Sequence, residues 1–353
     1  MGRPSAREGP RRNTSARPHL CVARLQAADV TRGPRAASRT PSRRMSDGAA
    51  LTRTVRPERP LQLGAVISTF RRGGGDPTSW SDRGRTWVFA WRVPTGPVTL
   101  RLIDHPRLGE VEAQAWGEGA EWVLDRLPHL LGEHDDDADF ESHHDVVGEA
   151  RRRFAGWRVP ASGLVVQALI PTIIEQRVTG KEAFAAYRTL VRRNGTPAPG
   201  IGADLRLFVP PDPKTWALIP SWEWLRAGVD GARSRPAVLV AARAGRLEQT
   251  VGMPSLEARR RLETVPGVGR WTANEVAHRA LGDADAVSFG DYHVAKNIGW
   301  ALTGSPVDDD GLAELLEPYA GHRYRVQRLL ELSGAMRPRR GPRFTLPTHL
   351  PGR

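Results

Sequence analysis

The feature that most constrains this chain of 353 residues is a tight turn between two amphipathic segments. The turn reads Pro266-Gly267-Val268-Gly269, and apolar residues recur at helical spacing on both sides of it. Two glycines within three residues permit positive φ and a close approach of the backbone to a ligand. Exposed N–H groups at the start of the second helix favour an anion such as phosphate, with Arg270 and Thr272 as further donors. The sequence therefore predicts a hairpin between two helices that anchors a nucleic-acid backbone, although an ordinary turn between helices gives the same pattern.

The distribution of charge supports a polyanionic partner. The chain has 52 Lys+Arg against 39 Asp+Glu, a net charge of +13. The net charge is +9 over residues 1–44, +4 over 45–110, −11 over 111–150 and +11 over 151–353. Nucleic acid is the first candidate for a protein of this charge, and the basic region that contains the hairpin is where we expect it to bind.

The N-terminal basic region is predicted to be disordered. It is rich in Arg, Pro and Ser without apolar periodicity, so it cannot bury enough surface to offset the entropy of ordering. Three interpretations stay open: a basic arm that binds DNA, a transit peptide, or a true start at Met45. The segment after residue 335 has a similar composition and is predicted to be a second flexible basic tail.

Several classes of protein are excluded by simple counts. The only cysteine, Cys21, cannot form an internal disulfide, a cysteine-ligated zinc site or an iron–sulfur cluster. No apolar run reaches the roughly 18 residues of a membrane span, so no membrane partner is expected. No secretory signal opens the chain, which favours a cytoplasmic location, bacterial and associated with the nucleoid.

Short apolar or alternating runs predict a small antiparallel sheet in the first half of the chain. Strands are expected at Leu61–Phe70, Thr86–Val93, Val98–Asp104 and Glu110–Trp116, because glycine- and proline-rich turns separate these runs. A helix over 121–131 precedes the acidic stretch His134–Asp137. Carboxylates and imidazoles together can bind a metal, but the spacing is not that of a zinc site, and a solvated acidic loop is the simpler interpretation.

Helical patterns dominate from residue 160 onward. The fold class expected is therefore α+β, with a small N-terminal antiparallel β-rich domain before an all-α domain. The predicted layout is a tail over 1–55, a β-rich domain over 56–120, a helix and acidic linker over 121–159, an all-α domain over 160–335 and a tail over 336–353. The expected helices are Ser162–Val178, Lys181–Arg193, Glu223–Ala227, Pro236–Glu248, Ser255–Thr264, Trp271–Leu281, Tyr292–Leu302, Gly311–Glu317 and His322–Leu332.

The hairpin and the residues after it resemble the helix-hairpin-helix DNA glycosylase superfamily. Residues 286–298 read AVSFGDYHVAKNI and place Asp291 22 residues after Gly269, where the family has a catalytic aspartate. The similarity is strongest to the AlkA-like branch, the 3-methyladenine DNA glycosylase II enzymes, and covers about residues 160–335. It implies an active site in a cleft between helical subdomains, a monomer, and double-stranded DNA with damaged bases as the partner in base excision repair.

Two departures narrow the branch. Relatives of the endonuclease III type have a lysine after Gly-Arg of the hairpin, and this chain has Trp271 there. The nearest lysine, Lys296, lies outside the motif, so the resemblance implies a monofunctional enzyme without lyase activity. Gly-Arg-Trp-Thr-Ala-Asn at 269–274 is similar to the AlkA-like pattern, in which the tryptophan lines the base pocket. Many relatives of the endonuclease III type also have a four-cysteine cluster, which a chain with one cysteine cannot form.

The same resemblance assigns roles upstream of the hairpin and along its second helix. In the segment Ile-Ile-Glu-Gln-Arg-Val at 173–178, Gln176 is placed near the base pocket and Arg177 at the residue that fills the gap left by the flipped base. An apolar wedge is usual there, so Arg177 is a departure; both residues are also compatible with the polar end of a buried helix. Glu275 lies one turn after Trp271 and is assigned to the base pocket, where an acid either favours a cationic base or caps the pocket wall; both interpretations stay open.

Asp291 is expected to do the chemistry. A carboxylate beside the sugar stabilises the oxocarbenium-like cation that forms as the base departs, or orients a water. A plain helix N-cap is the alternative, and the two roles are compatible. No cofactor is required; a structural Na⁺ or K⁺ is implied at the carbonyls of Glu263, Val265 and Val268. The open alternatives are another lesion, such as an oxidised, deaminated or uracil base, and a non-catalytic DNA-binding protein.

Overall fold

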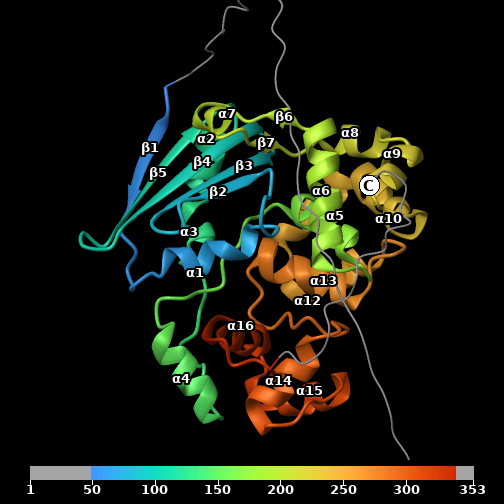
Figure 1. Cartoon of the computed structure of the whole chain (residues 1–353). Helices are drawn as coiled ribbons and strands as arrows, with labels where there is room; N and C mark the ends of the chain where they lie inside the picture. The colour runs from blue at the N-terminus through green and yellow to red at the C-terminus, as the bar shows by residue number, and fades with distance from the viewer. Residues whose placement is uncertain (1–48, 339–353) are drawn as a thin grey trace, which may run out of the picture. The chain divides into compact units, whose positions relative to one another are not determined.

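The computed structural model describes residues 49–338 (Figure 1). The predictions for the N-terminal segment up to residue 48, for a start at Met45 and for the tail from residue 339 lie outside this range. Within it the structure is a mixture of helices and one antiparallel sheet, which confirms the predicted α+β class.

The sheet has five antiparallel strands in the order β1-β5-β4-β3-β2 (Figure 1). Alternation and β-branched or aromatic residues form the central strands β3 (Thr86–Val93), β4 (Gly96–His105) and β5 (Glu110–Trp116), as predicted. Two edge strands, β1 (Leu51–Val55) and β2 (Ser79–Ser81), were not predicted. Since β1 pairs with β5, the sheet begins inside the segment that the sequence assigned to the tail.

The predicted strand Leu61–Phe70 is wrong. This segment forms α1 (Leu63–Ile67) and η1 (Ser68–Phe70), and its buried residues Leu63, Val66 and Ile67 follow helical spacing. A short apolar run of this kind has no periodicity long enough to separate a buried strand from one turn of buried helix.

The acidic stretch is only partly solvated. It lies between the short helices α2 (Ala120–Asp125) and α3 (Leu127–Leu130) and the helix α4 (Asp145–Arg153). The Asp135 carboxylate is buried and accepts hydrogen bonds from both terminal nitrogens of Arg325, at 2.8 and 2.7 Å. Within residues 49–338, no group of three or more His, Cys, Asp or Glu side chains is placed to hold a metal ion.

The helices after residue 160 follow the sequence pattern closely. α5 (Val165–Glu175) is buried nearly all round and contains Pro171, and α6 (Gly180–Asn194) begins with a capping box made by Thr179 and Glu182. A two-stranded ladder of β6 (Thr196–Pro197) and β7 (Phe208–Val209) follows α6. The remaining elements are α7 (Ile201–Asp204), α8 (Pro213–Leu218), α9 (Ser221–Arg226), α10 (Gly231–Ala242), α11 (Ala244–Glu248), η2 (Gln249–Gly252), α12 (Ser255–Glu263), α13 (Arg270–Val276), the π-helix η3 (Ala277–Leu281), α14 (Val294–Thr303), α15 (Asp309–Leu315), η4 (Glu317–Tyr319) and α16 (Arg323–Ser333).

The buried apolar residues form two large cores. The sheet core joins one face of the sheet and α1–α4 to α14, α15 and α16, with members such as Phe89, Leu102, Ile298 and Leu330. The hairpin core is built from buried residues between Val165 and Ala280, which lie in α5, α6, α8–α13 and η3 or in the turns next to them. The cores therefore do not follow the predicted domain limits, because the last part of the segment 160–335 packs with the sheet. No helix in the described range is long and apolar enough to cross a membrane.

Candidate active site

The two glycines of the hairpin between α12 and α13 have different conformations. Gly267 has φ of +88°, and a Cβ added to it would lie 2.3 Å from Cγ of Pro236 in α10. Only glycine fits there. Gly269 has an ordinary φ of −103°, and an added Cβ would meet nothing within 4 Å. Positive φ is therefore required at Gly267 alone, while Gly269 leaves open space at the exposed start of α13.

The structure separates the predicted phosphate donors into exposed and internal groups. Val268 is buried in the hairpin core, and its N–H donates to the carbonyl of Val265 at 2.9 Å. Thr272 is only 2% exposed. The Val268 N–H is therefore bonded within the hairpin, and the Thr272 side chain is buried. The N-terminus of α13 has no side-chain cap, so its first N–H groups are free of such a partner, and Arg270 beside them is exposed.

Arg270 also connects the hairpin with the segment that precedes Asp291. Its guanidinium carbon lies 4.0 Å from the centre of the Phe289 ring, a cation–π contact. Phe289 is buried in the sheet core, whereas Arg270 opens α13 of the hairpin core. The contact holds the predicted anchor and the predicted catalytic segment side by side.

Gln176 lies at the hairpin rather than free in a pocket. Its amide nitrogen donates to the Gly267 carbonyl at 2.9 Å and to the Thr272 hydroxyl at 2.8 Å. The side chain therefore fastens the end of α5 to the hairpin. The amide nitrogen therefore has two partners within the protein, and a position near the base pocket stays a prediction.

Arg177 follows as an exposed residue in the turn before α6. Its φ is +55°. Among residues 49–338, Arg177 is one of three non-glycine residues with a left-handed backbone conformation. Such a conformation costs about 1–3 kcal/mol and persists where neighbouring structure enforces it. Gln176 on one side and the capping box of α6 on the other supply that enforcement. The Arg177 side chain is thereby placed at the surface next to the hairpin.

Asp291 occupies the start of α14 and is partly exposed. Its Oδ1 accepts hydrogen bonds from the N–H groups of His293 at 2.7 Å and Val294 at 3.1 Å, so it does cap the helix. No hydrogen bond to Oδ2 occurs within residues 49–338, which leaves this oxygen available. The geometry is that of a fixed negative charge with one unoccupied oxygen.

Trp271 lies against the residue before Asp291. A Cβ added to Gly290, which has φ of +87°, would be 3.7 Å from Cβ of Trp271. The tryptophan is partly exposed, and its indole nitrogen is buried without a hydrogen-bond partner among the described residues. The structure thus brings together the hairpin, Trp271 and Asp291, three features that the sequence predicted separately.

Ser288 fixes the segment that leads to Asp291. Its hydroxyl donates to Oε1 of Glu275, and its N–H donates to Oε1 of Gln327 in α16 at 3.1 Å. The amide nitrogen of Gln327 returns a hydrogen bond to the Ser288 hydroxyl at 3.2 Å. Ser288 is therefore held between α13 and α16 by three hydrogen bonds.

Glu275 is a support for this segment and not an open wall of a base pocket. It is only 8% exposed and forms an ion pair with Arg279 at 2.6 Å. Burial acts to raise the pKa of Glu275, but the Arg279 guanidinium and the Ser288 hydroxyl overcome it and lower the pKa to about 2. The carboxylate is ionised at neutral pH and faces internal partners, so the predicted pocket role is not supported by its surroundings.

Three further side chains, which sequence reasoning missed, complete the support. Asn274 donates to the Val287 carbonyl, Asp309 of α15 accepts from the Gly290 N–H at 2.8 Å, and His278 contacts the Ala286 carbonyl. Burial, followed by the charge of Arg279, lowers the pKa of His278 to about 3, so it is a neutral side chain. Asn274 was visible within the motif at 269–274, whereas nothing in the sequence pointed to Asp309 or Gln327.

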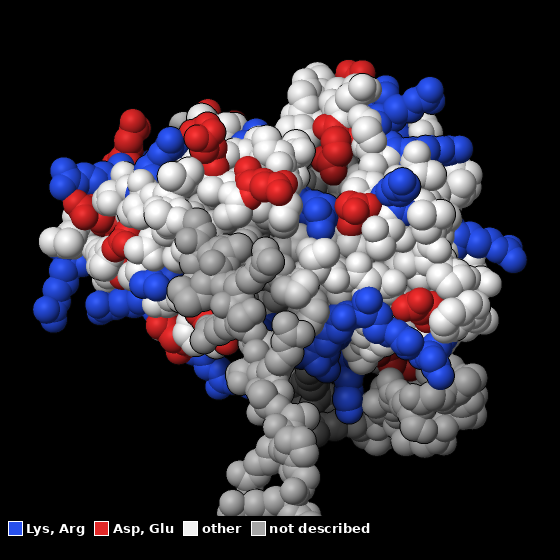
Figure 2. Space-filling view, turned by 90° about the horizontal axis from the view of Figure 1, so that it is seen from above, with Lys and Arg blue, Asp and Glu red and all other residues white. Residues whose placement is uncertain are grey.

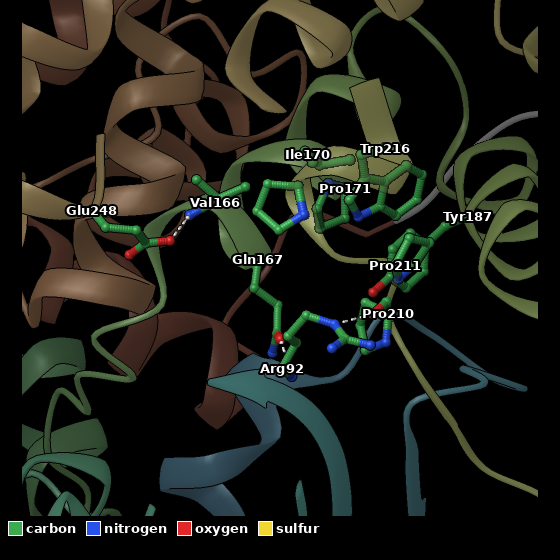
Figure 3. A pocket seen from close by; sticks show the side chains of 11 residues that line it. Arg92, Val166, Gln167, Ile170, Pro171, Tyr187, Pro210, Pro211, Trp216 and Glu248 are labelled. Atoms are coloured by element: carbon green, nitrogen blue, oxygen red, sulfur yellow. Dashed lines mark hydrogen bonds between the residues drawn. The ribbon is translucent and has the colours of Figure 1, made fainter. Parts of the chain in front are cut away.

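A separate pocket lies between β3, α5, α6 and α8 (Figure 3). The N–H of Arg92 donates to Oε1 of Gln167 at 2.9 Å, and the Glu248 carboxylate accepts the N–H groups of Val165 and Val166 at 3.0 and 2.9 Å. These polar groups join the sheet to α5 and cap that helix. None of the predicted site residues lines the pocket. Its lining is Arg92, Val166, Gln167, Ile170, Pro171, Tyr187, Pro210, Pro211, Pro213, Trp216 and Glu248.

Comparison with known proteins identifies the fold. The sequence matches no protein-family model and no curated protein sequence. The structure is similar to a 3-methyladenine DNA glycosylase from Archaeoglobus fulgidus, with a TM-score of 0.66 and 18% identity over 80% of this chain and 98% of that one. It is also similar to an 8-oxoguanine glycosylase/lyase from Clostridium acetobutylicum, with a TM-score of 0.61 and 12% identity over 81% and 99%. The described chain therefore has the helix-hairpin-helix DNA glycosylase fold.

Proposed function

We propose that this protein is a monofunctional DNA glycosylase of base excision repair that removes alkylated purines of the 3-methyladenine type from double-stranded DNA. The observation that carries the proposal is the position of Asp291. One oxygen of its carboxylate has no hydrogen bond among residues 49–338, and the residue before it, Gly290, lies against Trp271. The same segment is joined to the hairpin through Arg270 and Phe289. A plain DNA-binding hairpin needs no such carboxylate, which argues against the non-catalytic alternative.

The first step is to expose the damaged nucleotide. The open N-terminus of α13 and the space over Gly269 allow a phosphate to approach the backbone closely. Flipping the nucleotide out costs roughly a few kcal/mol, and less for a damaged pair. Arg177, held at the surface by its left-handed backbone, fills the gap. Its guanidinium stacks on the neighbouring bases, which replaces part of the stacking lost on flipping.

The second step breaks the N-glycosidic bond. The bonding electron pair leaves with the base, and the sugar becomes an oxocarbenium-like cation. The ionised Asp291 carboxylate stabilises this cation electrostatically, and a water then adds to the anomeric carbon and releases a proton to Asp291 or solvent. A base that is cationic before cleavage departs as a neutral molecule, so this site needs no separate general acid.

The absence of an amine at the reacting centre supports hydrolysis without strand cleavage. Trp271 stands where a lysine would attack the sugar. The ammonium of Lys296 lies 3.8 Å from the centre of the exposed Tyr292 ring. This contact places the amine on the Tyr292 ring, and the residue lies outside the hairpin motif that holds the attacking lysine in relatives with lyase activity.

Alkylated purines are the substrates that the aromatic surroundings favour. Trp271 is partly exposed next to Asp291, and Tyr292 directly after it is 74% exposed. A cationic base stacks on an electron-rich ring more strongly than a neutral base does, by about 0.5–2 kcal/mol. We expect the protein to act as a monomer at the nucleoid in the bacterial cytoplasm.

A monovalent cation at the hairpin is part of the proposal. The carbonyl of Val265 accepts the N–H of Val268 and keeps one lone pair, and within the described residues no hydrogen bond reaches the carbonyls of Glu263 or Val268. Three carbonyls of this kind suit Na⁺ or K⁺, which would add positive charge where a phosphate binds. Replacing K⁺ with a bulky organic cation should weaken binding to undamaged duplex DNA; unchanged binding would remove the ion from the proposal.

The function is tested with a panel of duplexes that carry one modified base each. Substrates with 3-methyladenine, hypoxanthine, uracil or 8-oxoguanine are incubated with the protein, and abasic sites are then cleaved with alkali. We expect release of 3-methyladenine to be fastest. Release of another base alone would correct the substrate class, strand cleavage without alkali would contradict the monofunctional assignment, and no release from any duplex would contradict the glycosylase.

A further inference from the structure

A row of basic side chains runs along one face of α6, beginning next to Arg177. Lys181, Arg188 and Arg192 are spaced by seven and four residues, which places them on a single face of the helix. From Lys181 to Arg192 the row is about 16 Å long at 1.5 Å per residue. Along the axis of a DNA duplex this length corresponds to about five phosphates of one strand, which repeat every ~3.4 Å.

The charges of this row are not neutralised within the described part of the chain. Lys181 and Arg192 are exposed and form no ion pair among residues 49–338. Arg188 donates only to carbonyls, those of Gly75 at 2.8 Å and Gly74 at 3.0 Å. By contrast, the neighbouring Arg193 is paired with Glu223.

A glycine loop from the sheet region lies against the same face of α6. A Cβ added to Gly73 would come within 2.2 Å of the Phe184 ring, so the loop packs directly on the helix between Lys181 and Arg188. Gly74 is exposed, and an added Cβ would meet nothing within 4 Å. The loop therefore braces Arg188 and exposes bare backbone beside the row.

Arg177 lies in the chain between Gln176, which is bonded to the hairpin, and α6, which carries the basic row. Gln176 joins the hairpin by two hydrogen bonds, Arg177 follows in the turn, and α6 then leads away. Figure 2 shows Lys and Arg side chains spread over the right half of that view, on the side where Figure 1 places α6 and α8–α10. A duplex opened at Arg177 would have one arm at the hairpin and the other along α6.

We propose that Lys181, Arg188 and Arg192, together with the Gly73–Gly75 loop, form a second DNA-binding surface. It holds the backbone of the duplex arm that lies across Arg177 from the hairpin, without reading sequence. The proposal rests on the proposed function, because it takes duplex DNA as the ligand. Under this proposal the sheet region contacts DNA directly, because the backbone of the Gly73–Gly75 loop lies at the surface beside the basic row.

The test measures the affinity for an undamaged duplex as a function of salt. The double variant Lys181→Gln with Arg192→Gln removes two charges that have no partner within the described residues. Each lost phosphate contact should lower the slope of log affinity against log salt by about 0.9, so affinity should fall about 60-fold near 0.1 M salt and converge with wild type near 1 M. The matched control is Arg107→Gln with Arg226→Gln, two exposed arginines outside the row. Equal slopes for the two double variants would overturn the proposal.

Duplexes with one shortened arm identify which part of the DNA the row contacts. For wild type, shortening either arm next to the damaged base should weaken binding. For the row variant, shortening one particular arm should have no further effect, because that arm's contacts are already lost. Equal sensitivity to both arms in the row variant would contradict the assignment.

The variant Gly74→Glu tests the loop. Its side chain fits without strain and places a negative charge beside the row, so affinity should fall while the melting temperature stays unchanged. Unchanged affinity would exclude the loop from the surface. These experiments need no base release. A shifted slope without excision would contradict the glycosylase alone, and excision with an unshifted slope would contradict this surface alone.

Discussion

The two apolar cores differ in how the chain builds them and in what they contribute to the site. The hairpin core comes from the single stretch Val165–Ala280 and carries the hairpin that we propose as the phosphate anchor, with Trp271 directly after it. The sheet core combines the early strands with α14–α16 and supplies Asp291 at the start of α14. Neither core alone contains both the DNA anchor and the carboxylate.

The difference shows that the active site depends on the boundary between the cores. Three contacts cross it close to the site: Glu275 with Ser288, Asn274 with Val287, and Arg270 with Phe289. Substitutions at this boundary should affect the rate of excision more than stability. Substitutions inside either core should do the opposite.

The largest expected effect is on the rate of excision in Asp291→Asn. The amide oxygen can still accept the N–H groups of His293 and Val294, so the cap and the fold persist, but the negative charge is lost. We expect single-turnover excision to fall by about 10³-fold, the upper range for removing one electrostatic stabiliser. DNA affinity and melting temperature should match wild type. Full excision by this variant would show that the sheet core does not supply the catalytic group.

The next effect is on stability, inside the sheet core and away from the boundary. Asp135→Asn leaves Arg325 buried without its charge partner, which should lower the free energy of unfolding by about 3–5 kcal/mol. Denaturant unfolding measures this loss. The excision rate per folded molecule should be unchanged. A large fall in that rate would contradict the expectation that substitutions inside a core affect stability and not catalysis.

Adjacent residues of α15 give a matched pair for the boundary. Asp309→Ala removes the acceptor for the Gly290 N–H and should slow excision about 10-fold, because even a 1 Å displacement of a catalytic group can cost more than that. Asp308→Ala removes the α15 cap, which accepts from Gly311 at 3.0 Å, and should cost about 1 kcal/mol of stability with no change in rate. Equal excision rates for the two variants would show that Asp309 does not help to position Asp291.

The two hairpin glycines test the anchor with a smaller effect. Gly269→Val should leave the melting temperature unchanged and weaken binding to all duplexes alike, about 10-fold, because its side chain fills the space where a phosphate approaches. Gly267→Ala should lower the melting temperature, because of its positive φ and the contact with Pro236. Undiminished affinity in Gly269→Val would contradict close approach of the phosphate.

The last effect, which is small near neutral pH and grows as the solution becomes acidic, is a dependence of stability on pH. The pKa of His278 is about 3 in the folded protein, against 6.5 for an ordinary histidine. The unfolded chain therefore binds a proton below about pH 6.5 that the folded protein does not, so stability should fall from pH 6.5 toward pH 3, with a slope of up to about 1.4 kcal/mol per pH unit. His278→Gln should show a flatter profile in chemical denaturation. An identical profile would mean that His278 does not stay neutral.

The sequence predicted the elements whose signals are local. The hairpin helices, the buried α5 and the capping role of Asp291 each follow from residues within a few positions of one another. The run at 61–70 failed because one buried turn of helix and a buried strand share a composition. Weak patterning also hid β1, which needs β5 as a partner.

The functions of individual side chains were harder to predict, because they depend on distant partners. Gln176 and Glu275 were both assigned to a pocket, yet each is bound within the protein, Gln176 to the hairpin and Glu275 to Ser288 and Arg279. Ser288 in turn depends on Gln327, 39 residues further along the chain. No local pattern in one sequence contains such a pairing.

The discontinuous sheet core has a consequence for the order of events during synthesis. A ribosome releases Val165–Ala280 as one stretch, so the hairpin core can form as soon as that stretch has emerged. The sheet core must wait for α16, whose residues Leu329 and Leu330 complete it near the end of the chain. If the proposed function holds, a nascent or truncated chain would therefore form its DNA-binding hairpin before it positions the Asp291 carboxylate, and would bind damaged DNA without excising the base.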